Sequence, residues 1–578
     1  MADPTNTEIA AALDELGDLY ELDGAVIHRV VAYRNGAKAA REASTSVAQL
    51  ARDGHATDLP GIGATLQEKI VALTETGQIP ALEKLRAKFP EGLVQMTTLP
   101  GLGPKRARRL FEELGIDSLE ALQQAAQDDR ISGLKGFGAR AQAALLEAVE
   151  QHRQDGPARR VVLSQALKVG EELLAEIRAQ PTTVQAEFAG SARRMTDSVK
   201  DLDIIATATD PAALARAASQ LPQVESSSTP GQNAVRLKTH SGLLLDLRIV
   251  EPDQFGNVLQ HLTGSKQHNV ALRDYAVRKG LHISEYGLLD DVTGTTHRCA
   301  TEEEVYALLG MAYIEPELRE NRGELEAALH GGLPKLIGLG DLKGDLHSHT
   351  TASDGTASIE EMAAAAQAAG YEYLAITDHS ASMGFGADVS NAELARQIDR
   401  VRALDATLTD FTLLIGSEVN ILPDGSLDYP DELLAQLDWV VASVHTSFRM
   451  AAPDMTARLV AAINHPYVDC IGHLTGRKIE QRPPYEFDFP TVLEAAAAAG
   501  TMLEINANPD RRDMNELHAR AAAAAGIPIV INTDSHRVDG FAVARFGIAT
   551  ARRAWLSASQ VANTRPWAEL APLLKRNR

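Results

Sequence analysis

The length, composition and charge of the chain already exclude several classes of protein. At 578 residues the chain is long enough for about four average domains, and 44% hydrophobic with 23% charged residues is typical of folded rather than disordered protein. Its net charge of −22 argues against a protein that wraps nucleic acid through a wholly basic surface, although local basic patches stay compatible with it.

Cysteine usage and the start of the sequence predict an intracellular location. Cys299 and Cys470 are too few for a disulfide framework, which favours a reducing compartment. The first 22 residues lack the basic and apolar blocks of a signal peptide, and no apolar run approaches the ~20 residues of a membrane helix. We therefore expect a cytoplasmic protein with no membrane partner.

Up to about residue 150 apolar residues recur at helical spacing, interrupted by three short repeats. The repeats are LPGIG, LPGLG and LKGFG, at residues 59–63, 99–103 and 134–138, and each precedes an amphipathic segment. A glycine turn before a helix offers backbone N–H groups and the positive end of the helix dipole to a phosphate, without reading a base. The alternative is a helix–helix turn with purely structural glycines, but three copies favour contact with the DNA backbone.

The repeats resemble helix-hairpin-helix motifs, and this resemblance defines the candidate DNA-binding residues. They are Gly61, Gly63, Gly101, Gly103, Lys105, Gly136 and Gly138. A local basic cluster adds positive charge beside the second repeat, and it consists of Lys105, Arg106, Arg108 and Arg109.

The pattern changes near residue 186, where strands replace helices. AEFAGSARRM, DLDIIATA and VRLKTHSGLLLDLRIV are predicted as strands joined by polar turns. Asp201 and Asp203 are two positions apart on one such strand, so their carboxylates face the same side, and Asp246 lies on the next strand. Three clustered carboxylates repel one another unless divalent cations neutralise them. Two Mg²⁺ ions bridging a triphosphate would do so and would activate an attacking hydroxyl.

A lone D-x-D is usually a solvated strand edge, which is the alternative here. The upstream Gly190, Ser191, Arg193 and Arg194 make phosphate chemistry the better interpretation. The stretch GGLPKLIGLGDLKG then predicts a linker.

From residue 345 onward short apolar strands alternate with Ala-rich helices. The predicted strands are YLAITDH, TLLIGSEVN, WVVASVH, DCIGH, TMLEINAN and IPIVINTDSH. This alternation predicts parallel strands with helices outside them, either as a barrel or as a doubly wound sheet.

Histidines and carboxylates accumulate at the ends of these strands, where parallel α/β folds gather their sites. The nine candidate ligands are His347, His349, Asp354, His379, Glu418, His445, His473, Asp534 and His536. Imidazole and carboxylate ligands without cysteine suit Zn²⁺, Mn²⁺ or Fe²⁺. Two or three such ions would activate water and stabilise the leaving oxygen of a phosphoester. A purely structural metal site is the alternative.

Residues 1 to about 315 resemble the family X DNA polymerases, on the strength of the GSARR, DLD and LDLR segments. The resemblance implies a helical N-terminal domain followed by fingers, palm and thumb, and gap-filling nucleotide addition. It implies that Asp201, Asp203 and Asp246 hold Mg²⁺ or Mn²⁺. It further implies that Asp246 helps to deprotonate the primer 3′ hydroxyl.

The same resemblance implies the residues that contact the nucleotide and the template. They are Gly190, Ser191, Arg194, Gly264, Ser265, Asn269 and Arg273. Two positions depart from the family pattern: Lys200 replaces a glycine, and His261-Leu262 replaces a Tyr-Phe pair. We expect the second change to weaken discrimination against ribonucleotides.

A possible lyase site also follows from this resemblance. Lys69 matches the Schiff-base lysine of the family's 5′-deoxyribose-phosphate lyase, and His28, Tyr33 and Arg34 match its 5′-phosphate pocket. Thr65 replaces a supporting lysine. The alternative for Lys69 is an ordinary exposed helix lysine.

Residues 341 to about 570 resemble the polymerase and histidinol phosphatase (PHP) domain, which implies a distorted (β/α)7 barrel with a trinuclear site. The implied ligand sets are His347, His349, Glu418 and Asp534; Glu418, His445 and His473; and Asp354, His379 and His536. Arg477 and Arg511 are expected to meet a substrate phosphate, whereas His465 and His518 are expected to lie outside the site.

Together these patterns predict a multidomain α+β and α/β protein. The expected parts are a lyase-like helical domain (1–85), fingers (86–155), palm (156–252), thumb (253–318), linker (319–340) and PHP domain (341–578). We expect a DNA polymerase that fills short gaps in repair and trims 3′ ends, acting on gapped or primed DNA and dNTPs. The alternative is a DNA-binding repair nuclease or 3′-phosphatase whose palm is inactive.

Overall fold

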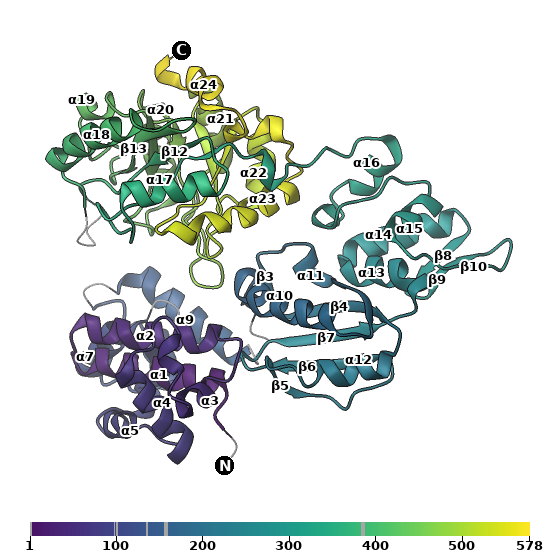
Figure 1. The fold of residues 1–578 in the computed structure, drawn as a ribbon. Coiled ribbons are helices and arrows are strands. Elements are labelled where there is room, and N and C mark those ends of the chain that lie inside the picture. The colour runs from purple at the N-terminus through teal and green to yellow at the C-terminus, as the bar shows by residue number, and fades with distance from the viewer. Residues whose placement is uncertain are drawn as a thin grey trace. The chain divides into compact units, whose positions relative to one another are not determined.

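The computed structural model describes residues 3–97, 99, 102–134, 137–154, 160–382 and 388–577, and Figure 1 shows its fold. The chain forms two compact units. The first consists of Met1–Val161, Gln165–Phe188 and Lys200–Pro252, and the second of Val162–Ser164, Ala189–Val199 and Asp253–Arg578. The short segment Ala189–Val199 therefore packs with the second unit, although the strands on either side of it belong to the first.

The first unit begins with helices, as the sequence predicts. They are α1 (Asn6–Leu22), α2 (Ile27–Glu42), α3 (Val47–Arg52), α4 (Ala64–Thr76), α5 (Pro80–Arg86), α6 (Glu91–Thr97), α7 (Pro104–Leu114), α8 (Leu119–Gln127) and α9 (Gly138–Gln154). In α1, Thr5 and Glu8 form a capping box. Leu13, Leu16 and Leu19 in that helix are fully buried, because their spacing places them on one apolar face.

A five-stranded sheet completes the first unit, in the order β2-β4-β7-β6-β5. Its elements are α10 (Leu163–Ala179), β2 (Thr183–Phe188), β4 (Asp201–Ala208), α12 (Pro211–Ala218), β5 (Val224–Ser227), β6 (Ala234–Thr239) and β7 (Leu244–Ile249). Strands β4 and β7 are parallel, and their register places Asp203 opposite Asp246. The predicted convergence of carboxylates on neighbouring strands is thus present.

The prediction of one strand across AEFAGSARRM is wrong in its second half. Strand β2 ends at Phe188, and α11 (Gly190–Arg193) follows it. Gly190 has a φ of 63°, a left-handed conformation that glycine adopts readily and that breaks the extended backbone.

The second unit contains a group of helices with a small antiparallel sheet. Its elements are α13 (Phe255–Thr263), α14 (Lys266–Arg278), β8 (Leu281–Ser284), β9 (Gly287–Asp290), β10 (Thr296–His297), α15 (Glu302–Leu308) and α16 (Glu324–His330). The two short strands β1 (Val161–Val162) and β3 (Ser198–Val199) pair with each other. Helix α16 lies inside the predicted linker 319–340, so that stretch is partly ordered structure.

The rest of the second unit is a parallel barrel, with its helices around the strands (Figure 1). The strands are β11 (Gly344–Asp345), β12 (Tyr373–Ile376), β13 (Thr412–Asn420), β14 (Trp439–Ser443), β15 (Cys470–Ile471), β16 (Met502–Asn506) and β17 (Ile529–Asn532). The helices are α17 (Ile359–Ala368), α18 (Asn391–Asp405), α19 (Asp431–Leu434), α20 (Ala452–Asn464), α21 (Phe489–Ala499), α22 (Glu516–Ala524), α23 (Ala544–Arg553) and α24 (Trp567–Leu570).

The strand order decides between the two predicted α/β architectures. The strands follow one another from β11 to β17 without the reversal that defines a doubly wound sheet. A parallel bridge between Ser348 and Ser535 joins the segments after the first and last strands. The barrel expectation is therefore confirmed. Among the described residues no helix is long and apolar enough to cross a membrane.

Candidate active sites

The nine predicted ligands of the second half come together at one end of the barrel. Each lies at or just beyond the carboxyl end of a strand, except Asp354, which lies in the loop after β11. This is the end at which parallel barrels carry their sites, because the strand–helix loops converge there.

Glu418 is the centre of this cluster. Its side chain is 1% exposed, and its Oε1 lies 3.1 Å from His445 Nε2 and 2.8 Å from His473 Nε2. Its Oε2 lies 2.8 Å from His379 Nδ1 and 3.4 Å from His347 Nε2. Burial would raise the pKa of Glu418, but the surrounding histidines hold it well below its usual range. His349 Nε2 also lies 3.6 Å from Oε2, so one carboxylate is shared by five imidazoles.

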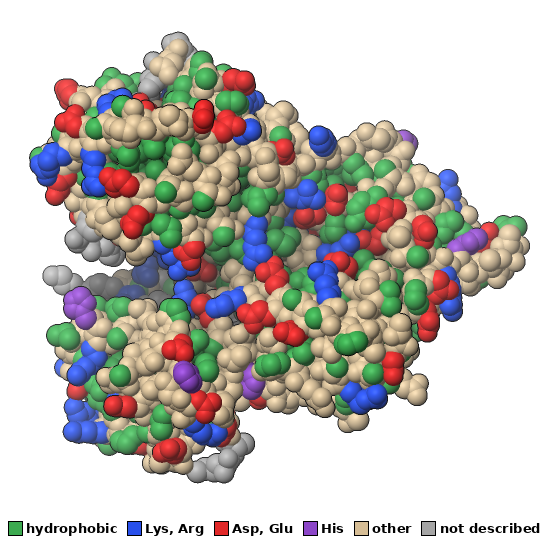
Figure 2. Space-filling model, in the orientation of Figure 1, with side chains coloured by type: hydrophobic (Ala, Val, Ile, Leu, Met, Phe, Trp, Pro, Cys, Tyr) green, Lys and Arg blue, Asp and Glu red, His purple; other side chains and the backbone are tan. Residues whose placement is uncertain are grey.

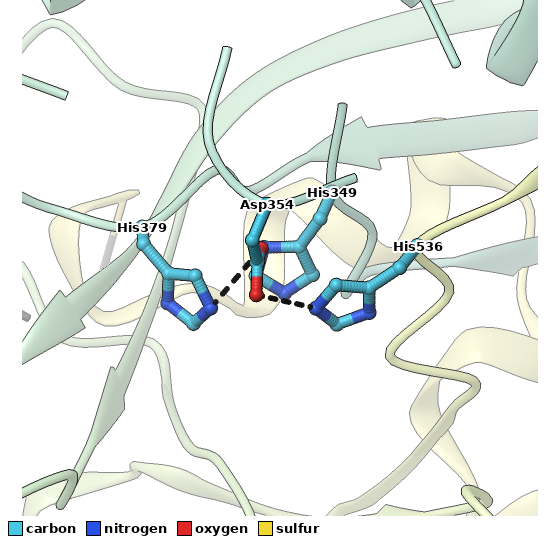
Figure 3. Close-up of side chains that lie close together, drawn as sticks. All are labelled: His349, Asp354, His379 and His536. Atoms are coloured by element: carbon cyan, nitrogen blue, oxygen red, sulfur yellow. Dashed lines mark ion pairs between the residues drawn. The ribbon is translucent and has the colours of Figure 1, made fainter. Parts of the chain in front are cut away.

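The carboxylate of Asp354 lies among the imidazole rings of His349, His379 and His536, as Figure 3 shows. Its oxygens lie 3.5 Å from His379 Nε2, 3.2 Å from His536 Nε2 and 3.7 Å from His349 Nδ1. Although burial lowers the pKa of His379, Glu418 and Asp354 raise it to about 10. The pKa of His536 is likewise raised to about 9, against burial, by Asp354 and Asp534. The neighbouring carboxylates thus favour the protonated form of His379 and His536.

The geometry of the cluster fits metal ions. Three groups of residues can each offer ligand atoms that all lie within 4.8 Å of one another. The groups are His349, Asp354, His379 and His536; His347, His349 and Asp534; and His379, Glu418 and His445. Among the described residues, His347 Nε2 and both ring nitrogens of His349 are buried without a hydrogen-bond partner. Such groups are rare in folded proteins unless they serve a ligand. Because adjacent groups share residues, the donors suit neighbouring divalent ions.

These groups differ in part from the ligand sets that the resemblance implied. His349 and His379 each belong to two groups, and because a neutral imidazole coordinates through one nitrogen, each can serve either of two adjacent ions but not both. His473 is in none of them but contacts the shared Glu418. The sets remain predictions, while the assembly of all nine residues is what the structure shows.

Sequence reasoning missed the carboxylate that supports the cluster. His347 Nδ1 donates to Glu504 Oε1 over 2.7 Å, and Glu504 also accepts from Asn532 Nδ2 at 3.0 Å. This contact fixes the ring so that Nε2 faces the site, which is how supporting carboxylates act on metal-binding histidines. The sequence feature that could have indicated this residue is a glutamate inside the apolar run TMLEINAN, at a buried position of β16.

The cluster opens into a cavity of about 290 Å³ with a basic and aromatic side. Besides the ligands, its lining includes Phe448, Lys478, Arg482 and Arg511. The Arg482 guanidinium lies 4.1 Å from the centre of the Phe448 ring, and Arg511 Nε lies 4.0 Å from Asp534 Oδ2. The lining therefore combines cations with an aromatic face beside the metal ligands.

Only one of the two predicted phosphate-binding arginines lines this cavity. Arg511 does so, whereas Arg477 pairs with Asp197, at 2.7 Å, and donates to the Arg512 carbonyl. Lys478 and Arg482 were missed. His465 pairs with Asp431 instead of the cluster, as expected.

In the first unit, the three predicted metal-binding carboxylates lie on β4 and β7. Asp246 is bound by Arg236, whose Nε and Nη2 each lie 2.6 Å from one of its oxygens. The hydrogen bonds and charge of Asp246 raise the pKa of Arg236, and the charges of Asp201 and Asp203 add to this effect. Sequence reasoning missed Arg236, which follows from the register of β6 against β7. In the described residues these three aspartates form no group as tight as those in the barrel.

The predicted nucleotide-binding residues of the second unit lie around α11 and the start of α14. Arg194 Nη1 donates to the Thr263 carbonyl at 2.5 Å, and its Nε lies 3.1 Å from Glu320 Oε1. Ser265 caps α14, and Asn269 donates to the His261 carbonyl at 2.7 Å. The GSARR and HLTGS motifs are thus brought together within this unit, while Arg273 is exposed on α14.

The glycines of the three repeats lie at helix N-termini where the structure describes them. Gly63 and Gly103 are the N-caps of α4 and α7, and Gly138 begins α9. Gly61 has a φ of 99°, which a side chain would strain. Gly101 and Gly136 lie outside the described residues. The exposed N-termini fit the predicted contact with phosphates.

The basic cluster beside the second repeat is partly neutralised. Arg108 and Arg109 pair with Glu112 and Glu113, and Arg106 lies 4.4 Å from the centre of the Phe137 ring, whereas Lys105 is exposed. Basic and acidic side chains are interspersed over the face in Figure 2. Any attraction to DNA must therefore be local.

The predicted lyase residues lie on α2 and α4. Lys69 is partly buried, and His28 is exposed. Tyr33 is buried and stacks on Tyr20, with 5.2 Å between ring centres, and Arg34 lies 2.7 Å from Glu21. The lyase site stays a prediction.

Four family models match the chain. They are a helix-hairpin-helix domain at residues 4–79, a SAM-like helix-hairpin-helix tandem at 94–150, the DNA polymerase beta thumb at 258–320 and the PHP domain at 345–507. The chain is 36% identical to the DNA polymerase/3′-5′ exonuclease PolX of Bacillus subtilis over 99% of both proteins. A protein of Acetivibrio thermocellus named "Probable phosphatase" is 33% identical over 35% of this chain and 82% of its own length.

Proposed function

The chain belongs to the family X DNA polymerases that carry a PHP domain and is a DNA polymerase with a 3′–5′ exonuclease, and from this premise we propose that it fills short gaps in DNA repair, including base excision repair. Its substrates are gapped or primed duplex DNA and dNTPs. It acts as a cytoplasmic, nucleoid-associated monomer. Lys69 is the proposed nucleophile for removing a 5′-deoxyribose phosphate.

Polymerisation is proposed to use the aspartates of β4 and β7. Asp201, Asp203 and Asp246 would hold Mg²⁺ or Mn²⁺, and such ions would supply charge to neutralise the triphosphate and to lower the pKa of the attacking hydroxyl. An oxygen of Asp246 accepts the proton of the primer 3′ hydroxyl, and Arg236 orients that carboxylate through its two hydrogen bonds.

The observation that carries the exonuclease assignment is the sharing of Glu418 by five buried imidazoles beside an open cavity. The nine ligands would hold two or three divalent ions, with Zn²⁺, Mn²⁺ and Fe²⁺ as the candidates, and these ions would supply an activated water and charge to stabilise the leaving 3′ oxygen. Lys478, Arg482 and Arg511 bind the phosphodiester, and the Phe448 ring supports the Arg482 guanidinium, which lies over its face.

Separating the two activities tests this function. Asp203→Ala abolishes addition of one nucleotide to a gapped duplex and leaves 3′ trimming intact, because the two ligand sets share no residue. His349→Ala does the reverse. Both activities are followed on one labelled gapped substrate.

The matched control is His465→Ala, which removes a histidine of the same barrel that pairs with Asp431 outside the cluster. It keeps both activities. Loss of both activities in a folded Asp203→Ala or His349→Ala protein would refute the assignment of two separate sites.

A second candidate activity of the barrel is removal of a 3′-phosphate. The similarity of this region to a protein named as a phosphatase favours it, and the same ligands serve a phosphomonoester. Release of inorganic phosphate from a 3′-phosphorylated primer tests it, with His349→Ala as the inactive reference.

A further inference from the structure

A short loop of the second unit follows Ser191 and Arg194, the residues proposed to contact the nucleotide, and barrel side chains hold it. Two of its carbonyls accept from one arginine. Arg512 Nη2 donates to the Met195 carbonyl and Nη1 to the Thr196 carbonyl, each at 2.9 Å.

Further bonds fix both ends of this loop. Arg477 Nη1 lies 2.7 Å from Asp197 Oδ2, and Ser198 Oγ donates to Glu480 Oε1 at 2.8 Å. Arg553 Nη1 donates to the carbonyl of Arg194 itself at 2.8 Å. We call the four barrel residues, Arg477, Glu480, Arg512 and Arg553, the loop clasp.

Burying the charged groups of the clasp costs free energy of folding. Arg512 is 1% exposed, and burying a guanidinium is unfavourable unless its donors are satisfied. Inside the barrel its Nε donates to Thr550 Oγ1 at 3.0 Å, while both terminal nitrogens are directed at the loop. None of the clasp residues is among the nine candidate metal ligands, so the exonuclease chemistry does not explain them.

The turn that carries part of the clasp also reaches the exonuclease cavity. Arg477 and Glu480 contact the loop, while Lys478 and Arg482 from the same turn line the cavity. A hydrogen bond from Lys478 N to the Arg482 carbonyl, at 2.8 Å, closes this turn. One rigid element of the barrel therefore touches both the loop and the cavity.

We propose that the clasp positions Ser191 and Arg194 for the phosphates of the incoming nucleotide, so that Arg477 and Arg512 are positioning residues of the polymerase located in the exonuclease barrel. The inference rests on the proposed nucleotide contacts of Ser191 and Arg194. A loop displaced by about 1 Å can cost on the order of a hundredfold in rate, so the clasp has a measurable effect.

The test is a double-mutant cycle on the Asp197–Arg477 pair. KM for the dNTP and kcat of one-nucleotide gap filling are measured for Asp197→Ala, Arg477→Ala and the double variant. We expect each single substitution to raise KM by about tenfold with a smaller change in kcat, and the double variant to be no worse than the poorer single one, because paired residues are not additive.

Three controls separate positioning from loss of structure. Asp197→Ala keeps the wild-type exonuclease rate, because Asp197 lies outside that site. Arg400→Ala, at an exposed barrel arginine paired with Glu360, leaves KM unchanged. Ser198→Ala removes the hydrogen bond to Glu480 and is also expected to raise KM. This variant keeps the proposal testable if Asp197→Ala does not fold.

Ser191→Ala tells failure of the inference from failure of the proposed function. If Ser191→Ala raises KM while Asp197→Ala and Ser198→Ala do not, the clasp does not position the loop. If Ser191→Ala leaves KM unchanged, the proposed nucleotide contact is wrong and the inference falls with it.

Discussion

The barrel cluster and the three aspartates of the five-stranded sheet are both proposed metal sites, yet they are built differently. In the barrel, Glu418 is fully buried and is fixed by five histidines from four strand ends. In the sheet, Asp246 is partly exposed and is held by one arginine. A site preassembled in the core and a site on a sheet surface should therefore respond differently to substitution.

The largest effect is expected at Glu418. Glu418→Gln removes the charge that five imidazoles share, and we expect a loss of exonuclease rate on the order of a thousandfold, because the cations of such a site supply several kcal/mol. Gap filling stays within twofold of wild type. An exonuclease rate within tenfold of wild type would show that Glu418 is not a shared ligand.

The supporting carboxylate should have a smaller effect. Glu504→Gln keeps the shape of the side chain but weakens the bond that orients His347, so we expect metal affinity or activity to fall by about ten- to a hundredfold. The exposed Glu494→Gln on α21 is the matched control. Equal affinities in the two variants would assign Glu504 to folding alone.

The pH dependence of the barrel sharpens the comparison further. The pKa values of His379 and His536, raised to about 10 and 9, mean that both rings are protonated at neutral pH without metal. Their contribution to the stability of the metal-free protein is complete below pH ~6.5 and is lost as pH rises through those values. Bound metal replaces these protons. The gain in Tm on adding Mn²⁺ should therefore grow from pH 6.5 to 10, and a constant gain would contradict the assignment.

At the sheet, Arg236→Ala is expected to lower kcat/KM for gap filling by about tenfold, because a tenfold change in rate corresponds to the free energy of about one charge-assisted hydrogen bond. The exonuclease rate should not change. Arg248→Ala, at an exposed arginine of β7, is the control. If Arg248→Ala and Arg236→Ala behave alike, orientation of Asp246 is not the cause.

The smallest effect is expected in DNA binding. Lys105→Glu should flatten the dependence of log affinity on log salt by about one phosphate contact, whereas Arg109→Glu should change it less, because Arg109 is already paired with Glu113. Equal slopes in both variants would remove the α7 N-terminus from the DNA-binding surface.

The barrel and its cluster could be predicted because every ligand but Asp354 lies at or just beyond the end of an apolar strand, so chain order alone brings them to one end. Glu504 escaped prediction because only packing shows that it meets His347, which is 157 positions away in the sequence. Arg512 meets Thr196 across 316 positions of sequence, and no local pattern reports such a contact. Arg477 was assigned to the substrate for the same reason, because its partner Asp197 belongs to a distant loop.

The central claim is that the barrel cluster is a multinuclear metal site sharing Glu418. The most direct measurement is the number of Mn²⁺ ions bound per chain, determined on metal-stripped and reconstituted protein for the wild type, Asp203→Ala and Glu418→Gln. We predict that the barrel binds two or three ions in the wild type and in Asp203→Ala, and at least one fewer in Glu418→Gln. The same number of ions in Glu418→Gln as in the wild type would contradict the account.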